Sequence, residues 1–151
     1  MKKTAFKVVP DTNVFVAAEK SRHTASPNRE FVSRWKNNEF EVLYSEDTLL
    51  EYISKLREKG IAETTVTKLI QALFELARKI GIEFYHLPYY PIDSDDIAFL
   101  LCAENGQATH IVSYDSDLKA IDHLYSFKVC NTLEFLTELR KELLGEDAEI
   151  F

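Results

Sequence analysis

The stretch KVVPDTNVF, residues 7–15, places an acid directly after a short apolar run that begins at Phe6. Val8 and Val9 suit a buried strand, but Asp11 does not, because an isolated carboxylate is costly to bury. In an open α/β sheet, ligands usually bind at the carboxyl ends of the strands. Asp11 is therefore expected to end a first strand at residues 6–10 and to face a binding site there.

The length and composition fit one globular domain. The chain has 151 residues, of which 46% are hydrophobic and 28% are charged, and this is enough for a real core. No apolar run is long enough to span a membrane, and the start MKKTAFKVV is too short for a signal peptide. We expect one domain at residues 1–145, followed by an acidic C-terminal tail at residues 146–151.

The charge and the cysteines narrow the class of protein. A balance of 18 basic and 25 acidic residues gives a net charge of −7, which argues against binding nucleic acid by bulk charge. It does not exclude a nuclease, because an acidic active site can be loaded with metal. Cys102 and Cys130 both lie in apolar surroundings, which favours reduced core cysteines in a cytoplasmic protein.

Strand-like and helix-like patterns alternate along the chain. Ser26 followed by Pro27 is typical of a helix start, and so is Ser45 before two acids. The expected strands are residues 6–10, 40–44, 82–87, 109–114 and 127–130, the expected helices are 27–37, 46–60, 65–80, 94–106, 116–121 and 132–144, and residues 18–28 are an expected polar loop. This alternation predicts an α/β domain with a mostly parallel central sheet and helices on both faces.

Acids recur at the ends of the expected elements. Asp115 and Asp117 follow the strand that contains HIVSY, so they should share the carboxyl edge of the sheet with Asp11. No obvious arginine or lysine accompanies them, and unpaired acids at one edge repel each other. A divalent cation such as Mg²⁺ or Mn²⁺ would resolve the conflict, because it prefers oxygen ligands, activates water and stabilises charge on phosphate.

The run DSDD opens a helix and offers three more acids. Ile97 and Leu100 belong to the inward stripe of that helix; Asp96 borders the stripe, whereas Asp95 points nearly opposite. Asp96 is thus the better site candidate, with Asp95 in solvent and Asp93 as a cap. A single acid at a helix start is usually only a cap, so the prediction depends on the coincidence of acids at three separate boundaries.

Four segments in order resemble the blocks of the PIN-domain family, and the resemblance covers nearly the whole chain. DTNVF fits the opening motif, and YSEDTLLEYISKL places the family glutamate at Glu51. DSDDIAFLLCA places the family aspartate at Asp96, and HIVSYDSDL places the last acid at Asp115, with an accessory acid at Asp117. PIN domains are metal-dependent ribonucleases that are common as the toxins of bacterial and archaeal toxin–antitoxin pairs.

The resemblance implies a Rossmann-like sheet, hydrolysis of RNA phosphodiester bonds with Mg²⁺ or Mn²⁺, an antitoxin encoded nearby and homodimers. A metal-bound water would attack phosphorus in line. The implied catalytic residues and metal ligands are Asp11, Glu51, Asp96 and Asp115, and the residues implied to orient ligands or water are Asn13, Ser113 and Asp117.

Three positions depart from these expectations. Proline stands at position 10, where the family has an aliphatic residue, and proline is unusual in a central strand. Tyr114 precedes the last acid, where it could narrow the site or stack on a base. From the residues alone, Glu51 lies opposite the apolar positions of its helix and is expected at the surface, and Asp47, one turn earlier, could replace it.

Two alternatives to the nuclease remain at this point. One is a PIN module that binds a protein or RNA partner without cutting, which the departures at Pro10 and Tyr114 keep open. The other is a phosphoacceptor receiver domain, also a doubly wound sheet with acids around magnesium. A receiver requires paired acids after its first strand, where the sequence DTN offers only one.

Overall fold

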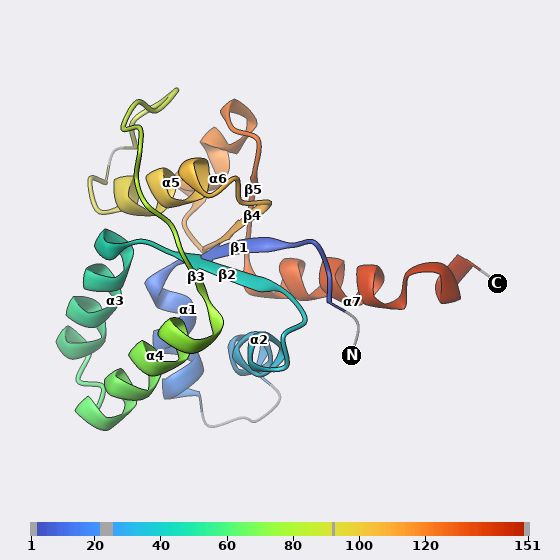
Figure 1. Ribbon diagram of the computed structural model, residues 1–151, viewed down its shortest axis with the longest axis horizontal. Helices are drawn as coiled ribbons and strands as arrows, with labels where there is room; N and C mark the ends of the chain where they lie inside the picture. Colours follow the sequence, from blue (N-terminus) through green and yellow to red (C-terminus); the bar gives the residue numbers. More distant parts are fainter. Residues whose placement is uncertain (1–2, 22–25, 92, 150–151) are drawn as a thin grey trace.

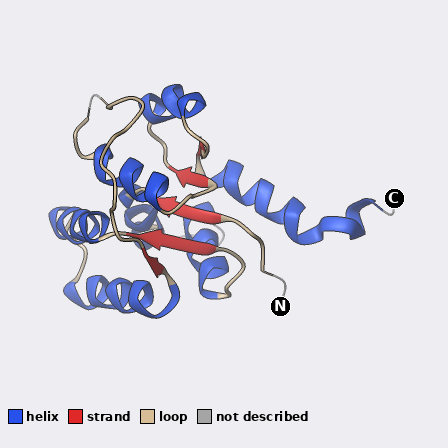
Figure 2. Cartoon of the chain, turned by 45° about the horizontal axis from the view of Figure 1, so that its top comes forward, coloured by secondary structure: helices blue, strands red, loops and turns tan. Residues whose placement is uncertain are grey.

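A five-stranded, all-parallel sheet forms the centre of the molecule (Figures 1 and 2). The computed structural model describes residues 3–21, 26–91 and 93–149. The strands are β1 (Lys7–Pro10), β2 (Glu41–Tyr44), β3 (Arg78–Lys79), β4 (His110–Val112) and β5 (Lys128–Cys130), and their order across the sheet is β3-β2-β1-β4-β5. This confirms the predicted α/β class with a parallel sheet.

Helices cover both faces of the sheet. Their bounds are α1 (Thr12–Lys20), α2 (Pro27–Lys36), α3 (Glu46–Glu58), α4 (Glu63–Leu76), α5 (Asp96–Asn105), α6 (Ser116–Ile121) and α7 (Thr132–Glu149), with a short 3-10 turn η1 (Asp122–Leu124). In Figure 1, α5 and α6 lie above the strands, and α1, α2 and α4 lie below them. No described helix is long and apolar enough to cross a membrane.

The central strand β1 is buried between β2 and β4. Val8 and Val9 are fully buried, and in the β4 pairing Pro10 stands opposite Val112. Because the strands are parallel, β1 and β4 end at the same edge of the sheet. The backbone N–H of Asp11 donates to the carbonyl of Val112 at 2.8 Å, so the pairing continues one residue past the proline.

Helix α1 begins immediately after Asp11, and residues 18–20, which were expected in a polar loop, belong to it. Its residues Thr12, Val14, Phe15 and Val16 are buried. The chain passes from strand to helix with only Asp11 between them, so no loop separates β1 from α1. The backbone of Asp11 is therefore held by β1 on its N-terminal side and by α1 on its C-terminal side.

The predicted strand at 82–87 is wrong, and the real edge strand is β3, which pairs with Leu43 and Tyr44 of β2. The side chain of Asn105 holds the 82–87 segment outside the sheet. Its carbonyl oxygen accepts from the backbone N–H groups of Glu83 (2.9 Å) and Phe84 (3.2 Å), and its NH₂ donates to the Phe84 carbonyl (2.9 Å). An amide side chain thus supplies the hydrogen bonds that a neighbouring strand would have made.

The two cysteines and the last helix complete the fold. Cys102 and Cys130 are free and buried, as the sequence predicts. Helix α7 continues past the expected end at residue 144, with a non-helical break at Gly145 (φ 46°). Its C-terminal part projects away from the sheet (Figure 1). Residues 150–151 of the expected acidic tail lie outside the described part of the chain.

The two predicted serine caps are present, and the cap at Ser45 can be tested. Ser45 is buried, and its hydroxyl accepts from the backbone N–H of Thr48 while the Thr48 hydroxyl accepts from the N–H of Ser45. We expect Ser45→Ala to lower the free energy of unfolding by about 1 kcal/mol, because the backbone N–H of Thr48 loses its acceptor, while the Thr48 hydroxyl still accepts from the N–H of residue 45. Urea denaturation measures this, and the exposed Ser54 on the same helix gives the control, Ser54→Ala. Equal midpoints for the two variants would contradict a stabilising cap.

Candidate active site

Asp11 occupies the junction between β1 and α1 and is half-buried. The Ser113 hydroxyl donates to its Oδ2 at 2.9 Å. Burial raises the pKa of Asp11, the Ser113 hydrogen bond and the N–H groups of Asn13 and Thr12 lower it, and the negative charge of Asp115 raises it again. The net result is a raised pKa, so the folded site makes the charged form of Asp11 less favourable than water does.

Ser113 connects two of the acids. It is buried at the end of β4. Its hydroxyl donates to Asp11 and accepts from the backbone N–H of Asp115 at 3.0 Å. One serine therefore fixes the Asp11 carboxylate and the chain segment that carries Asp115. The structure thus supplies contacts for the orienting role that the sequence suggested for Ser113.

Asp115 is the N-cap of α6, and its carboxylate accepts from the backbone N–H of Asp117 at 2.8 Å. The side chain of Asp117 itself is exposed. Asp117 thus contributes a main-chain donor that orients the Asp115 carboxylate. Asn13 resembles it in this respect, since its side chain is exposed and its N–H lies near Asp11.

Asp96 faces Asp115 from the first residue of α5. The pKa of Asp96 is raised to about 7, first by burial, then by the charge of Asp115 and a hydrogen bond with it, and further by Asp93 and Asp11. A hydrogen bond between two carboxyl groups requires a proton, so this pair shares one proton at lower pH. The charges of three other acids act on Asp96, so Asp96 lies close to the rest of the acidic cluster.

Of the other two acids of DSDD, Asp95 lies in solvent as the helical wheel predicts, but it, and not Asp93, is the N-cap residue of α5. Asp95 is exposed. Asp93 is also exposed, and its Oδ1 accepts from the backbone N–H of Asp95 at 2.9 Å, which closes the turn before α5. Only Asp96 of the three is half-buried. Asp96 therefore stays the candidate ligand that we propose within this run.

Glu51 lies nearer to the other acids than the residues of its helix suggested. It is half-buried, and its pKa is raised by burial and by Asp95, lowered by Lys55, and raised further by Asp93 and Asp11. The expectation of a fully exposed glutamate is wrong because the inward face of α3 was misplaced. Leu50, assigned to that face, is 63% exposed, whereas its neighbour Tyr52 is fully buried. Asp47 is exposed.

Tyr52 is a residue of this region that the sequence reasoning missed. It is completely buried, and its hydroxyl donates to the backbone carbonyl of Pro10. Its ring meets Phe15 edge-on at 5.0 Å. The bond ties α3, which carries Glu51, to the last residue of β1, directly before Asp11. A tyrosine one position after the candidate glutamate was the available signal, since a buried tyrosine hydroxyl usually finds a partner.

The chemistry of the donor set fits a divalent cation. In the described part of the chain, none of these carboxylates forms an ion pair with a lysine or arginine. Within the same residues, no group of three or more His, Cys, Asp or Glu side chains is already arranged to hold a metal ion. The fit thus rests on the Asp96–Asp115 pair, which binds a proton where a hard cation would neutralise the same charges.

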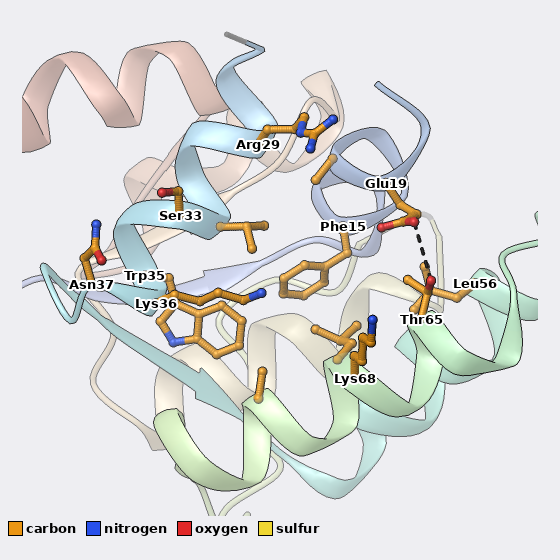
Figure 3. Close-up of a pocket in the computed structure, with 14 residues that line it drawn as sticks. Phe15, Glu19, Arg29, Ser33, Trp35, Lys36, Asn37, Leu56, Thr65 and Lys68 are labelled. Atoms are coloured by element: carbon orange, nitrogen blue, oxygen red, sulfur yellow. Dashed lines mark hydrogen bonds between the residues drawn. The ribbon is translucent and has the colours of Figure 1, made fainter. Parts of the chain in front are cut away.

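A larger cavity lies away from these acids. It has a volume of about 740 Å³ and is lined by residues of α1, α2, α3 and α4, with Phe15, Trp35 and Leu56 among them (Figure 3). Glu19 accepts a hydrogen bond from Thr65 across its rim at 3.4 Å. None of the site acids lines this cavity. The size of this cavity therefore does not locate the acidic site.

A parallel sheet with acids gathered after β1, at the start of α5 and after β4 defines an acidic site of the type that binds divalent cations. Residues 7–117 match the family model of the PIN domain, so the chain belongs to the PIN domain family. This confirms the resemblance found in the sequence and sets the receiver alternative aside. No curated protein matches the chain significantly.

A solved structure has the same fold. It is the crystal structure of VapBC2 from Rickettsia felis bound to a DNA fragment from their promoter, with a TM-score of 0.58. The likeness covers 83% of this chain and 98% of that chain at 15% sequence identity. At this identity the comparison establishes the shared fold and supports the single Rossmann-like domain.

The pKa of Asp96, raised first by burial and then by Asp115, predicts how stability depends on pH. The pKa of Asp96 is about 7 in the folded protein against an ordinary value of 3.8, so the folded protein binds more protons than the unfolded chain between these values. Stability therefore falls as pH rises through this window. In chelator, Asp96→Asn should gain roughly 1–3 kcal/mol relative to wild type from about pH 4 to about pH 7, then gain no more.

Urea denaturation across this range measures the effect, and Asp95→Asn is the matched control. Asp95 is the neighbouring residue, is exposed and is not among the named causes that raise the pKa of Asp96, so Asp95→Asn should lack the gain of Asp96→Asn. Parallel pH profiles for wild type and Asp96→Asn would contradict a raised pKa at Asp96.

Proposed function

We propose that the protein is a metal-dependent endoribonuclease in which Asp11, Glu51, Asp96 and Asp115 hold Mg²⁺ or Mn²⁺. The observation that carries the proposal is that Asp96 is partly buried and paired with Asp115, without a lysine or arginine of the described chain in an ion pair with either; burial first and then Asp115 raise the pKa of Asp96 to about 7. Such a site is unfavourable for the fold alone and becomes favourable when a cation is bound. Membership of the PIN domain family supports the same activity.

When bound, the metal would supply an activated water and stabilise charge on the phosphate. The chain's own residues fix the ligands. Ser113 holds the Asp11 carboxylate and the backbone of Asp115, and the N–H of Asp117 orients the Asp115 carboxylate. Below its pKa of about 7, Asp96 carries a proton beside Asp115, and that proton must leave before the pair can act as ligands.

The proline before Asp11 is compatible with this role. Pro10 is the last residue of β1, its carbonyl accepts from Tyr52, and the next N–H, that of Asp11, continues the pairing with β4. The missing donor of the proline therefore does not displace the acid from the sheet edge. The buried hydroxyl of Tyr52 thus holds Pro10, the position that departs from the family pattern.

A toxin of a toxin–antitoxin pair is the cellular role we propose. It rests on the PIN family membership and on the fold shared with the VapBC2 complex. We propose RNA as the substrate, an antitoxin as the cognate protein partner and a homodimer as the assembly. A short neighbouring gene for a DNA-binding protein would support the pairing.

A PIN module that binds a partner without cutting is the second candidate. The observation that favours it is that no three acids in the described chain are already arranged around a metal position. The two candidates differ in one property, since only the nuclease requires a cation that binds at Asp96.

Cleavage of labelled RNA tests the site directly. Asp11→Asn and Asp96→Asn should each lower the rate by more than the about 10–100-fold that is typical of losing an outer partner of a metal ligand, because an amide ligates poorly and carries no charge. Asp95→Asn should have a mild effect, since its side chain is exposed and acts on the site only through its charge near Glu51. Full activity of Asp96→Asn together with loss at Asp95 would reverse the assignment.

Metal binding tests the site without knowledge of the RNA. A ligand at one hundred times its dissociation constant stabilises the folded state by about 2.7 kcal/mol. Wild type should gain this with Mg²⁺ or Mn²⁺ in thermal melts, and Asp96→Asn should gain much less. A wild type that gains nothing from either metal at saturating concentration would favour the non-cutting module.

A further inference from the structure

A small cavity adjoins the acidic site on the β5 side. Its volume is about 190 Å³, and its lining includes Tyr114, Asp115, Asn131 and Glu134. Asp115 belongs to both the cavity and the acidic cluster, so whatever occupies the cavity lies next to the proposed metal ligands. The volume is below the about 300–1,000 Å³ of pockets that bury a drug-sized ligand, which suits one flat ring system.

Tyr114 forms an aromatic wall of this cavity and is held at its far end. The side chain is 53% exposed. Its hydroxyl donates to Oδ1 of Asn28 at 3.3 Å, and the same oxygen accepts from the Thr132 hydroxyl at 2.7 Å. An exposed ring that is anchored in this way loses little freedom when another ring stacks on it.

Asn131 and Glu134 give the cavity a polar edge. They cap α7 reciprocally: the N–H of Glu134 donates to Oδ1 of Asn131 at 2.9 Å, and the N–H of Asn131 donates to Oε1 of Glu134 at 3.0 Å. The amide NH₂ of Asn131 and the second carboxylate oxygen of Glu134 have no hydrogen-bond partner among the described residues. A donor and an acceptor thus stand side by side at the cavity, and the capping bonds fix both.

We propose that this cavity receives one unpaired base of the RNA, stacked on Tyr114, with its edge on Asn131 and Glu134. Recognition of unpaired RNA bases combines stacking on aromatic rings with hydrogen bonds to the base edge, and the cavity offers both. The inference rests on the proposed nuclease function and adds which residues of this chain would hold one base beside the acids.

The charge of the protein gives this subsite its importance. With a net charge of −7, the chain does not attract a phosphate backbone over its whole surface. Affinity for RNA must then come from the metal and from contacts with bases. A stacked base next to Asp115 would also fix the position of the adjoining phosphate relative to the acids.

Fluorescence of RNA that carries 2-aminopurine, a base quenched by stacking, tests the proposal without cleavage. The cleavage-defective Asp96→Asn protein with magnesium is titrated with single-stranded RNAs that carry the probe at successive positions. One position should be quenched on binding, and adding Tyr114→Ala should abolish the quench and weaken affinity about tenfold, or ~1.4 kcal/mol, within the range of one base–aromatic stack. Tyr114→Phe, which keeps the ring, should retain the quench.

Tyr85→Ala is the matched control, because Tyr85 is 65% exposed and follows Phe84, which is bound to Asn105 at the opposite end of α5 from Asp96. It should bind like its parent. In wild type, an abasic site at the quenched position should lower kcat/KM about tenfold, and Tyr114→Ala should remove most of that sensitivity.

The outcomes separate this inference from the nuclease proposal. RNA cleavage with an unchanged quench in the Tyr114→Ala background overturns the base subsite and leaves the nuclease intact. Equal cleavage of abasic and intact RNA by wild type does the same. A Tyr114-dependent quench without any metal-dependent cleavage supports the subsite and overturns the nuclease.

Discussion

The parallel pairing of β1 with β4 is the constraint on which the rest of the structure depends. It brings two segments that are about a hundred residues apart in the chain to one edge of the sheet, where Ser113 hydrogen-bonds Asp11 across a sequence separation of 102. The backbone bond from Asp11 to Val112 and the serine bridge to Asp115 follow from the same register. Shifting that register by one residue would turn these side chains to the opposite face.

The acids at this edge place function and stability in opposition. Burial and mutual repulsion raise the pKa values of Asp11, Glu51 and Asp96, and each shift measures a free-energy cost of keeping that group charged. Hydrogen bonds from Ser113 and from backbone N–H groups offset part of the cost at Asp11. The remaining repulsion is tolerable because the hydrophobic core around β1 is continuous. The core therefore offsets the free-energy cost of keeping these carboxylates charged.

The sequence predicts this site better where local chemistry decides than where long-range packing does. Asp11 and Asp96 could be chosen because strand ends and helix faces are local patterns. Glu51 could not, because the orientation of α3 is set by the burial of Tyr52, while Leu50 points to solvent. The false strand at 82–87 has the same origin: its aromatic residues favour a strand, and only the tertiary contact with Asn105 decides against it.

That contact has a consequence for solubility. The segment around Phe84 and Tyr85 is rich in exposed aromatics and would extend the sheet beyond β3 if its backbone were free to pair. A long aromatic edge strand is a template for association between chains. Asn105 occupies the backbone groups of residues 83 and 84, so the sheet ends at a strand of only two residues. The last residue of α5, the half-buried Asn105, thus protects the molecule against edge-to-edge aggregation.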